Sequence, residues 1–368
     1  MASVTFVVAT YNRPEPLRLA LASVLAQRRA DWRVIVVGDA CGPETAEAVA
    51  AFDEPRFRYL NLPARFGDQS GPNSVGMALA ETPYVALLNH DDVLLPDHLD
   101  VALGTLEGES ADLFIGRAAM AWAYRAGEGG EKTPVFSWIT PEGRLPREVY
   151  TGSFLLFEPV SAWVMRRSVA ERVGPWPAPR GSARYPIQAW LMRAWRAGTR
   201  FALDGPITTL NMLGHWQGRT GAQGEDWYTQ AGMPASWLLR ALTRDPDALR
   251  HDLQAEVAAH SRVRPHRFYP RWRSTPARRV LHGLAVNPAT AWAYRRLGVD
   301  AFEPVRRAFD LSYRLRGVAN PLLIGKTGFD YRAAPDIHDT IRWAQATYGG
   351  HLWREPAAGS DPLSAPGR

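Results

Sequence analysis

Strand and helix patterns alternate through the first 120 residues, and this alternation constrains the fold more than any other feature. Residues 4–9 and 32–37 are short, almost wholly apolar runs, which is typical of strands buried on both faces. Between them, residues 14–27 place leucine and valine at helical spacing on one face. The pattern continues with strands at 57–60, 84–88 and 113–115, and with helices at 43–52, 71–80 and 96–106. Short loops between such elements predict an α/β fold, a mostly parallel sheet flanked by helices with right-handed crossovers.

The rest of the chain is less regular. Residues 125–147 are rich in glycine, proline and charge, which predicts a mobile loop or insertion. Residues 150–213 return to mixed strands and helices, and from about residue 231 the pattern is helical and arginine-rich. We therefore expect one domain over 1–230, a helical C-terminal region over 231–354 and a disordered tail over 355–368.

Charge is distributed unevenly along the chain. Residues 231–368 hold 21 basic and 12 acidic residues, a balance of +9, whereas the first 230 residues carry 22 − 25 = −3. A basic C-terminal region indicates an anionic partner there. Lys132 and Lys326 are the only lysines, and this skew toward arginine is more typical of a GC-rich genome than of a nucleic-acid-binding protein, so no nucleic-acid partner is expected.

Cysteine content and hydropathy indicate the cellular compartment of the protein. Cys41 is the only cysteine, which excludes an intrachain disulfide and a cysteine-based zinc cluster. No apolar run approaches the ~18 residues that span a bilayer, and the first residues do not resemble a secretory signal. The expected location is the cytoplasm.

Polar residues follow several of the predicted strands. Asn89, His90, Asp91 and Asp92 come directly after the strand at 84–88. Adjacent acids at the end of a buried strand need a cation to neutralise them, and Mg²⁺ typically uses one or two carboxylates plus substrate phosphates. The alternative is that one of these aspartates only caps the helix that follows, and the pattern alone does not choose between the two.

Three further turns give weaker indications of a binding site. The turn 10–14 after the first strand can hold a base, ribose or phosphate through backbone N–H groups, or it is an ordinary turn with Pro14 in the first helical turn. Asp39 follows the second strand, where it accepts a hydrogen bond from a ligand or caps a helix. Arg65 begins the loop 65–73, where it pairs with phosphate or stays on the surface. His215, beside Trp216, is either a packed histidine or a metal ligand.

Taken in chain order, these pieces resemble a family 2 glycosyltransferase of the GT-A fold. Residues 7–13 are similar to the family's opening strand and turn, and residues 36–39 to its second strand and base-recognition acid. Asn73, with Gly76 and Ala80, matches its Asn-plus-Gly helix, and residues 89–92 stand in place of its DxD motif. The resemblance covers residues 3 to about 106, is looser over 150–216 and ends before 231.

The resemblance implies a nucleotide-sugar donor, with a UDP-sugar the commonest choice, and a divalent cation, Mn²⁺ or Mg²⁺. It implies a nucleotide-binding half at 1–120 and an acceptor half at 121–230. The cation would bridge the donor diphosphate and stabilise the departing nucleotide. The residues carried over for the nucleotide sugar are Thr10, Tyr11, Arg13, Asp39, Arg65, Asn73 and His90. Those carried over for the metal are Asp91, Asn89 and His215, and those for catalysis are Asp91 and Asp92.

Two positions depart from the family pattern. Asn89 replaces the first aspartate of DxD, which removes one negative charge and shifts more of the metal binding to Asp92. Ala189 stands where the family has its catalytic base, and neither Ala189 nor Gln188 can take a proton from an acceptor hydroxyl. Either the base comes from elsewhere, with Glu158 or Asp112 as candidates, or the chain is inactivated at Ala189.

The resulting expectation is a metal-dependent glycosyltransferase, inverting by family analogy, that acts on a glycan, lipid-linked or small-molecule acceptor. The alternative is a protein that binds a nucleotide sugar without transferring it. A sugar-1-phosphate nucleotidyltransferase is a weaker third choice, because residues 10–14 lack the glycine-rich loop that such enzymes carry. The basic C-terminal region either docks on anionic lipid at the inner face of the membrane or is a helical subdomain that covers the acceptor site or forms a homodimer.

Overall fold

The computed structural model describes most of the chain. The described residues are 2–126, 132–140, 159–178, 186–203, 205–212, 233–263, 288–299 and 329–349, with 304, 307, 311, 315 and 352. The predicted tail at 355–368 lies outside them, and the boundaries of the predicted domains stay a prediction.

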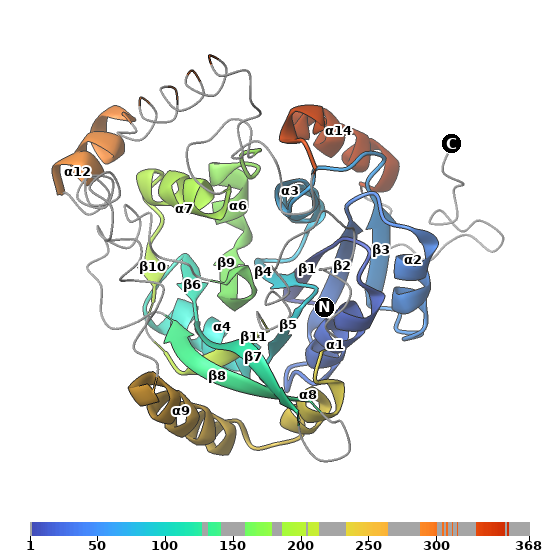
Figure 1. Cartoon of the computed structure of the whole chain (residues 1–368). Coiled ribbons are helices and arrows are strands. Elements are labelled where there is room, and N and C mark those ends of the chain that lie inside the picture. The colour runs from blue at the N-terminus through green and yellow to red at the C-terminus, as the bar shows by residue number, and fades with distance from the viewer. Residues whose placement is uncertain are drawn as a thin grey trace.

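A seven-stranded, mostly parallel sheet forms the centre of the molecule (Figure 1). Its order is β10-β6-β9-β4-β1-β2-β3, and only β9 runs antiparallel to its neighbours. The strands are β1 (Val4–Thr10), β2 (Trp32–Gly38), β3 (Phe57–Asn61), β4 (Tyr84–Asn89), β6 (Leu113–Ile115), β9 (Trp163–Arg166) and β10 (Phe201–Ala202). The expected α/β fold with parallel strands is confirmed, because each predicted strand of the first 115 residues is present.

Helices cover both faces of this sheet. On one face, α1 (Pro14–Leu25) and α4 (His98–Gly108) pack on the side chains of alternate strand residues, such as Phe6 and Val36. On the other face lie α3 (Ser70–Leu79), α6 (Arg167–Val173) and α7 (Pro186–Arg196), where Trp163, Trp176 and Trp190 stack together. The short helix α2 (Pro43–Ala50) follows β2.

A second sheet of four strands, ordered β5-β11-β7-β8, packs below the first. It contains β5 (Asp92–Leu94), β7 (Arg117–Ala126), β8 (Lys132–Thr140) and β11 (Ile207–Asn211). The prediction of a loop over 125–147 is wrong for residues 125–126 and 132–140, which form the antiparallel pair β7–β8. Glycine and charge near the turn hid these strands, and Pro134 is tolerated because β8 is an edge strand.

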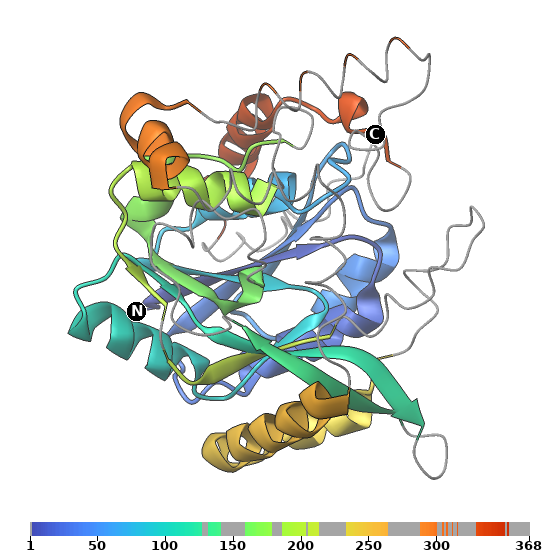
Figure 2. The same ribbon diagram turned by 60° about the vertical axis from the view of Figure 1, so that its left-hand side comes forward.

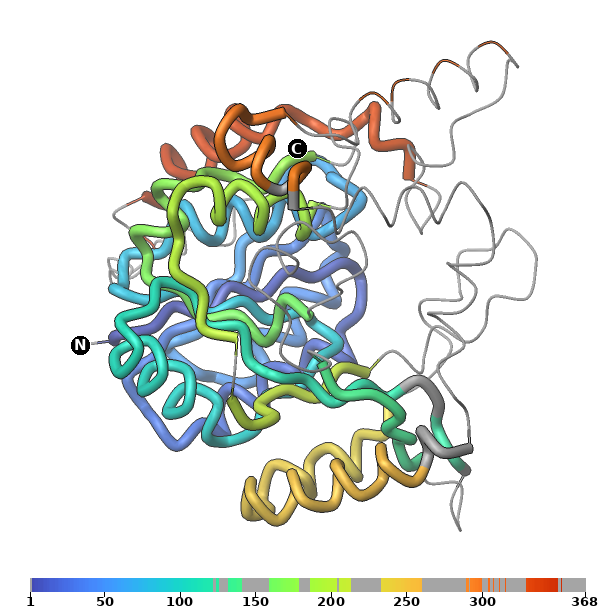
Figure 3. Tube along the Cα trace, turned by 90° about the vertical axis from the view of Figure 1, so that its left-hand side faces the viewer, coloured from blue at the N-terminus to red at the C-terminus, as the bar shows by residue number. Residues whose placement is uncertain are grey.

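The described residues after 231 are mainly helical, as expected. They form α8 (Ala235–Ala241), α9 (Pro246–Val263), α12 (Pro288–Leu297), the short 3₁₀ helix η6 (Tyr331–Ala333) and α14 (Ile337–Tyr348). Figures 2 and 3 show α9 along the second sheet, on the opposite side of the molecule from α12 and α14. None of the helices in the described ranges is long and apolar enough to cross a bilayer.

Candidate functional site

The carboxyl ends of β1, β2 and β4 meet at one edge of the large sheet. Backbone register pairs Thr10 with Gly38 and Ala9 with Asn89, so the three following turns lie side by side. In a sheet of this kind ligands bind at such an edge. The sheet therefore brings the turns at 10–13, at 39–42 and at 89–92 together, as the sequence predicted.

Asp91 faces the first turn. Its Oδ2 atom lies 3.2 Å from Nη1 of Arg13, and its side chain keeps 16% exposure whereas that of Arg13 keeps 4%. Nδ1 of His90 lies 3.2 Å from the carbonyl oxygen of Ala9, which holds the imidazole over the end of β1. Asp91 is therefore a partly accessible carboxylate held between two neighbouring turns.

Asp92 has a different environment. It is buried, and its carboxyl oxygens accept hydrogen bonds from Asn89 Nδ2 at 3.2 Å, Ser161 Oγ at 2.5 Å and Asn211 Nδ2 at 2.8 Å. Burial, followed by the negative charge of Asp91, raises the pKa of Asp92. These contacts join β4, β11 and the short 3₁₀ helix η2 (Val160–Ala162). Both oxygens of Asp92 thus serve a buried network, and the expectation that Asp92 takes more of the metal binding stays a prediction.

Asp39 holds the loop that follows β3. Its Oδ1 accepts the backbone N–H of Phe66 at 2.7 Å, and its Oδ2 accepts that of Gly67 at 2.9 Å. Burial raises the pKa of Asp39 to about 6, against the opposing effect of these two amides and of Arg65. Gly67 has φ +78°, a conformation that favours glycine. The predicted base-recognition acid is thus bound to backbone amides of the loop 65–73.

Arg65 and Tyr11 stack on each other at the same edge. The guanidinium carbon of Arg65 lies 3.8 Å from the centre of the Tyr11 ring, a cation–π contact. Thr10 is buried, and among the described residues its Oγ1 has no hydrogen-bond partner. Asn73 is also buried, in the first turns of α3, where Nδ2 lies 3.5 Å from Gln69 Oε1.

The turns are further joined by contacts that the sequence did not indicate. Asn12, at φ 45°, accepts the backbone N–H of Gly42 at 2.8 Å through Oδ1 and so joins the turns after β1 and β2. Cys41 lies between them, and burial raises the pKa of its thiol, which makes it a poor nucleophile.

Tyr124, on β7, lies near these turns and was not predicted from the sequence. Its hydroxyl is buried and has no hydrogen-bond partner among the described residues. Burial raises its pKa first, and the charge of Asp91 adds to this, whereas Arg13 opposes it. Tyr124 therefore lies within electrostatic reach of the Asp91–Arg13 pair. Its position next to a predicted loop concealed it.

The source of a catalytic base stays open. Gln188 and Ala189 lie in the first turn of α7, and both are partly exposed. Asp112 precedes β6, at the amino edge of the sheet, and its Oδ1 lies 3.2 Å from Arg200 Nη2, so it does not face the turns described above. Glu158 and His215 lie outside the described residues.

The described residues fit a metal site that a substrate would complete. They contain no group of three or more His, Cys, Asp or Glu side chains that could hold an ion. Asp91 supplies one accessible carboxylate, and the amide oxygen of Asn89 is a second hard donor in the same turn. This agrees with a Mg²⁺ or Mn²⁺ site that uses few protein ligands plus phosphate oxygens.

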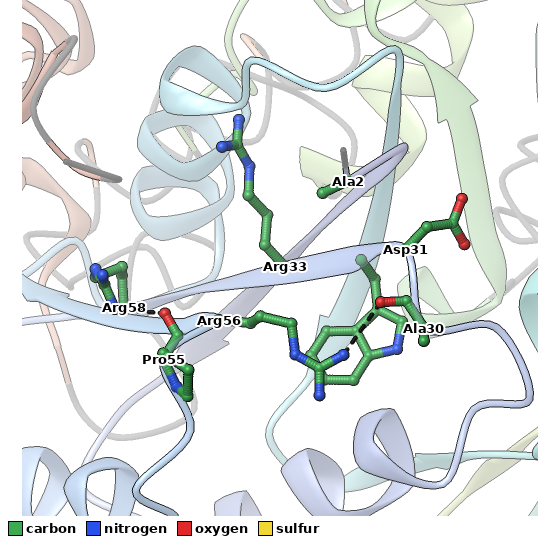
Figure 4. A pocket seen from close by; sticks show the side chains of 8 residues that line it. Ala2, Ala30, Asp31, Arg33, Pro55, Arg56 and Arg58 are labelled. Atoms are coloured by element: carbon green, nitrogen blue, oxygen red, sulfur yellow. Dashed lines mark hydrogen bonds between the residues drawn. The ribbon is translucent and has the colours of Figure 1, made fainter. Parts of the chain in front are cut away.

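A separate surface depression of about 530 Å³ lies at the amino ends of β2 and β3, away from these turns (Figure 4). Its three arginines already have protein partners. Arg33 pairs with Glu81 at 3.2 Å, Arg56 pairs with Glu54 at 2.7 Å, and Arg58 donates to the carbonyl of Leu352 at 2.9 Å. These contacts give the three arginines a structural role, and the depression is not part of the candidate site.

Comparison with known proteins agrees with the geometry. Residues 5–174 match the model of the family "Glycosyl transferase family 2". The succinoglycan biosynthesis protein ExoO of Rhizobium meliloti is 38% identical over 112 residues, 30% of this chain and 32% of that protein. ExoW of the same organism is 35% identical over 118 residues, 31% of this chain and 37% of that protein. The matches thus span about a third of the length of these curated relatives.

Solved structures give more distant similarity. Residues 1–349 of S. aureus TarS are 18% identical, with 95% of this chain and 91% of that chain covered and a TM-score of 0.44. The mannosyltransferase PcManGT from Pyrobaculum calidifontis, in complex with GDP-Man and Mn²⁺, is 13% identical, with 80% and 86% covered and a TM-score of 0.42. The family match over residues 5–174 confirms the resemblance that the motifs indicated, and the sheet topology agrees with it.

Proposed function

We propose that this protein is a glycosyltransferase that moves a sugar from a nucleotide-diphosphate sugar to an acceptor hydroxyl. The observation that carries the proposal is the position of Asp91. It is a partly accessible carboxylate beside Arg13, at the edge where Tyr11, Asp39 and Arg65 also lie. In a family 2 domain, this is the combination that a nucleotide-sugar donor requires.

Each group has a distinct role in this proposal. Tyr11, Asp39 and Arg65 hold the nucleoside, with Thr10 and Asn73 beside them. Arg13 and His90 position Asp91, which would hold a divalent cation together with Asn89 and, from outside the described residues, His215. When bound, the cation neutralises the charge that develops on the departing diphosphate. Acceptor attack on the opposite face of the anomeric carbon then gives inversion, and the acceptor proton needs a base that we leave unassigned.

The names of relatives support a donor and acceptor class. ExoO and ExoW are described as succinoglycan biosynthesis proteins, which supports a growing polysaccharide as acceptor. The E. coli protein WfgD is 23% identical over 103 residues and is described as transferring glucose from UDP-Glc to a diphosphoundecaprenol-linked sugar. A UDP-sugar donor and a lipid-linked or polysaccharide acceptor are therefore our first choice.

Exposed side chains of the C-terminal region support contact with a membrane surface. Trp292 and Leu297 of α12 are 59% and 63% exposed, and Val299 just beyond it is 55% exposed. Arg296 is exposed on the same helix. Apolar side chains beside arginine are typical of helices that bind anionic lipid. This would place the protein at the inner face of the membrane, and a homodimer through the same surface is the competing arrangement.

The alternative function is binding of a nucleotide sugar without transfer, and Ala189 is the observation that favours it. The two are separated by measuring UDP release from a panel of UDP-sugars with lipid-linked, glycan and small-molecule acceptors. Transfer predicts UDP release that depends on the acceptor and falls by roughly 100-fold or more in Asp91→Ala. Donor binding without any UDP release would contradict transfer, and a gain of release in Ala189→Asp would show that a base has been lost.

A further inference from the structure

A C-terminal segment, residues 329–349 together with Leu352, returns to the loops of the candidate nucleotide site. Figure 1 shows α14 alongside α3, the helix that follows the loop 65–73. Ala344 and Leu352 are buried in one cluster with Ile35 and Val37 of β2. The segment is thus packed into the main core, although it lies far beyond residue 174, where the family match ends.

Phe329, at the start of this segment, contacts two residues of the loop. Its ring centre lies 5.2 Å from the guanidinium carbon of Arg65, and the same carbon lies 3.8 Å from the centre of the Tyr11 ring. Phe329 also covers Gly67, where a Cβ atom would lie 2.1 Å from the Phe329 ring. Gly67 therefore has no room for a side chain, and its close contact fixes the backbone against the ring.

This arrangement determines where the Arg65 side chain can be. Two aromatic contacts restrict the rotation of the guanidinium, and stacking of this kind does not use its in-plane N–H donors. The backbone N–H of Gly67 is bonded to Asp39, so Phe329 supports both the arginine and the amide partner of the acid. Proteins bind nucleotides through planar side chains that stack on the base and through arginine N–H groups that donate to phosphate.

We propose that Phe329 is a positioning residue of the nucleotide-binding site, supplied by a segment outside the family domain. It holds Arg65 and Gly67 in the geometry that a nucleoside diphosphate requires. This inference rests on the proposed function, since it assigns the ligand as the nucleotide part of the donor. It implies that nucleotide affinity depends on residues 329–349 and Leu352 as well as on the domain at 5–174.

The test is calorimetric titration of UDP, dTDP and GDP, each with Mn²⁺, into the full chain. Phe329→Leu keeps an apolar side chain but removes the aromatic ring, and we expect the Kd of the bound nucleotide to rise roughly 3- to 30-fold. Phe329→Tyr restores the ring and is expected to bind as the wild type does. Ile341→Ala is the matched control, because Ile341 is a partly buried residue of α14 that packs against the same cluster as Phe329. We expect it to lower the thermal midpoint and to leave the Kd unchanged.

Three results would overturn the inference. If folded Phe329→Leu binds as tightly as the wild type, Phe329 does not position the site, while the proposed function stands. If Ile341→Ala weakens binding as much as Phe329→Leu does, the effect is one of general packing. If the wild type binds none of the three nucleotides, the proposed function fails and the inference fails with it. Should Phe329→Leu not fold, Arg65→Lys removes the planar group from the other side of the contact, and wild-type affinity in that variant would also contradict the proposal.

Discussion

Two parts of the molecule, residues 4–115 and the described residues after 231, are held in place by different kinds of contact. Over residues 4–115, continuous backbone pairing between buried strands fixes the turns that form the candidate site. After residue 231, side-chain packing and a few polar contacts attach the helices: Leu249 and Ala344 are buried in clusters with strand residues, Arg250 pairs with Asp97, and Phe329 packs on Arg65 and Gly67. The comparison teaches that the sheet places the site loops, whereas their surroundings depend on side-chain contacts between segments far apart in the chain.

The largest effect is expected at Arg250. Its Nη2 lies 2.7 Å from both carboxylate oxygens of Asp97, its Nε donates to the carbonyl of Ile207 at 2.7 Å, and both ion-pair partners are almost buried. Arg250→Ala leaves Asp97 buried without this partner, so we expect the free energy of unfolding to fall by about 3–5 kcal/mol in urea titration. The control is Arg244→Ala, which removes an exposed pair with Asp252 and is expected to change the stability little. Equal losses in the two variants would show that α9 is not attached in this way.

A smaller loss of stability is expected from His98, which lies in the part formed by residues 4–115. His98 is completely buried beside Phe114, and burial lowers its pKa to about 3. The unfolded chain takes up the proton near pH 6.5 but the folded chain does not, so stability falls as the pH drops below 6.5. Between pH 7.5 and 5.5 we expect this residue to remove about 1.4 kcal/mol.

The measurement for His98 is urea unfolding of the wild type and of His98→Leu at both pH values. The variant should lose less stability on acidification, by the amount given above. His251→Leu, at an exposed position on α9, serves as the control and should behave like the wild type. An unchanged pH dependence in His98→Leu would mean that the buried imidazole is not the acid-sensitive group.

The smallest effect concerns the pH dependence of nucleotide binding through Asp39. The fold raises the pKa of this carboxyl to about 6, and its ionised form accepts the amides of Phe66 and Gly67. Below pH 6 the carboxyl gains a proton and becomes a poorer acceptor, so we expect UDP affinity to fall roughly 3- to 10-fold between pH 7.5 and 5.5. Because the raised pKa makes Asp39 favour the folded state on acidification, its protonation does not produce this loss by unfolding. Asp39→Asn should bind UDP weakly at both pH values, and a pH step that persists in the variant would assign it to another group.

The sequence predicted the part formed by residues 4–115 well because its signals are local. Apolar runs marked the strands, and their parallel order brought the turns at 10–13, 39 and 91 to one edge without any knowledge of distant contacts. The sequence could not distinguish the role of Asp91 from that of Asp92. The buried role of Asp92 depends on Ser161 and Asn211, which come from other elements far along the chain.

The rest of the chain, after residue 115, was predicted only in outline. Helices were expected after residue 231, but nothing local indicates that Arg250 would reach Asp97 or that Phe329 would reach Arg65. The loop predicted over 125–147 includes residues 125–126 of β7 and 132–140 of β8, because glycine and proline there outweigh a short alternating pattern. Long-range side-chain contacts decide these regions, and a single sequence does not show them. The roles of the site residues themselves stay predictions.

The central claim is that Asp91 holds a cation that completes a nucleotide site. The most direct test is calorimetric titration of UDP into the wild type and into Asp91→Asn, each with and without Mn²⁺. The account predicts that Mn²⁺ tightens UDP binding to the wild type by roughly 10-fold or more and that this gain is lost in Asp91→Asn, while weak metal-free binding remains. An equal gain from Mn²⁺ in both proteins would contradict the assignment of Asp91, and no UDP binding under any condition would contradict the UDP donor site itself.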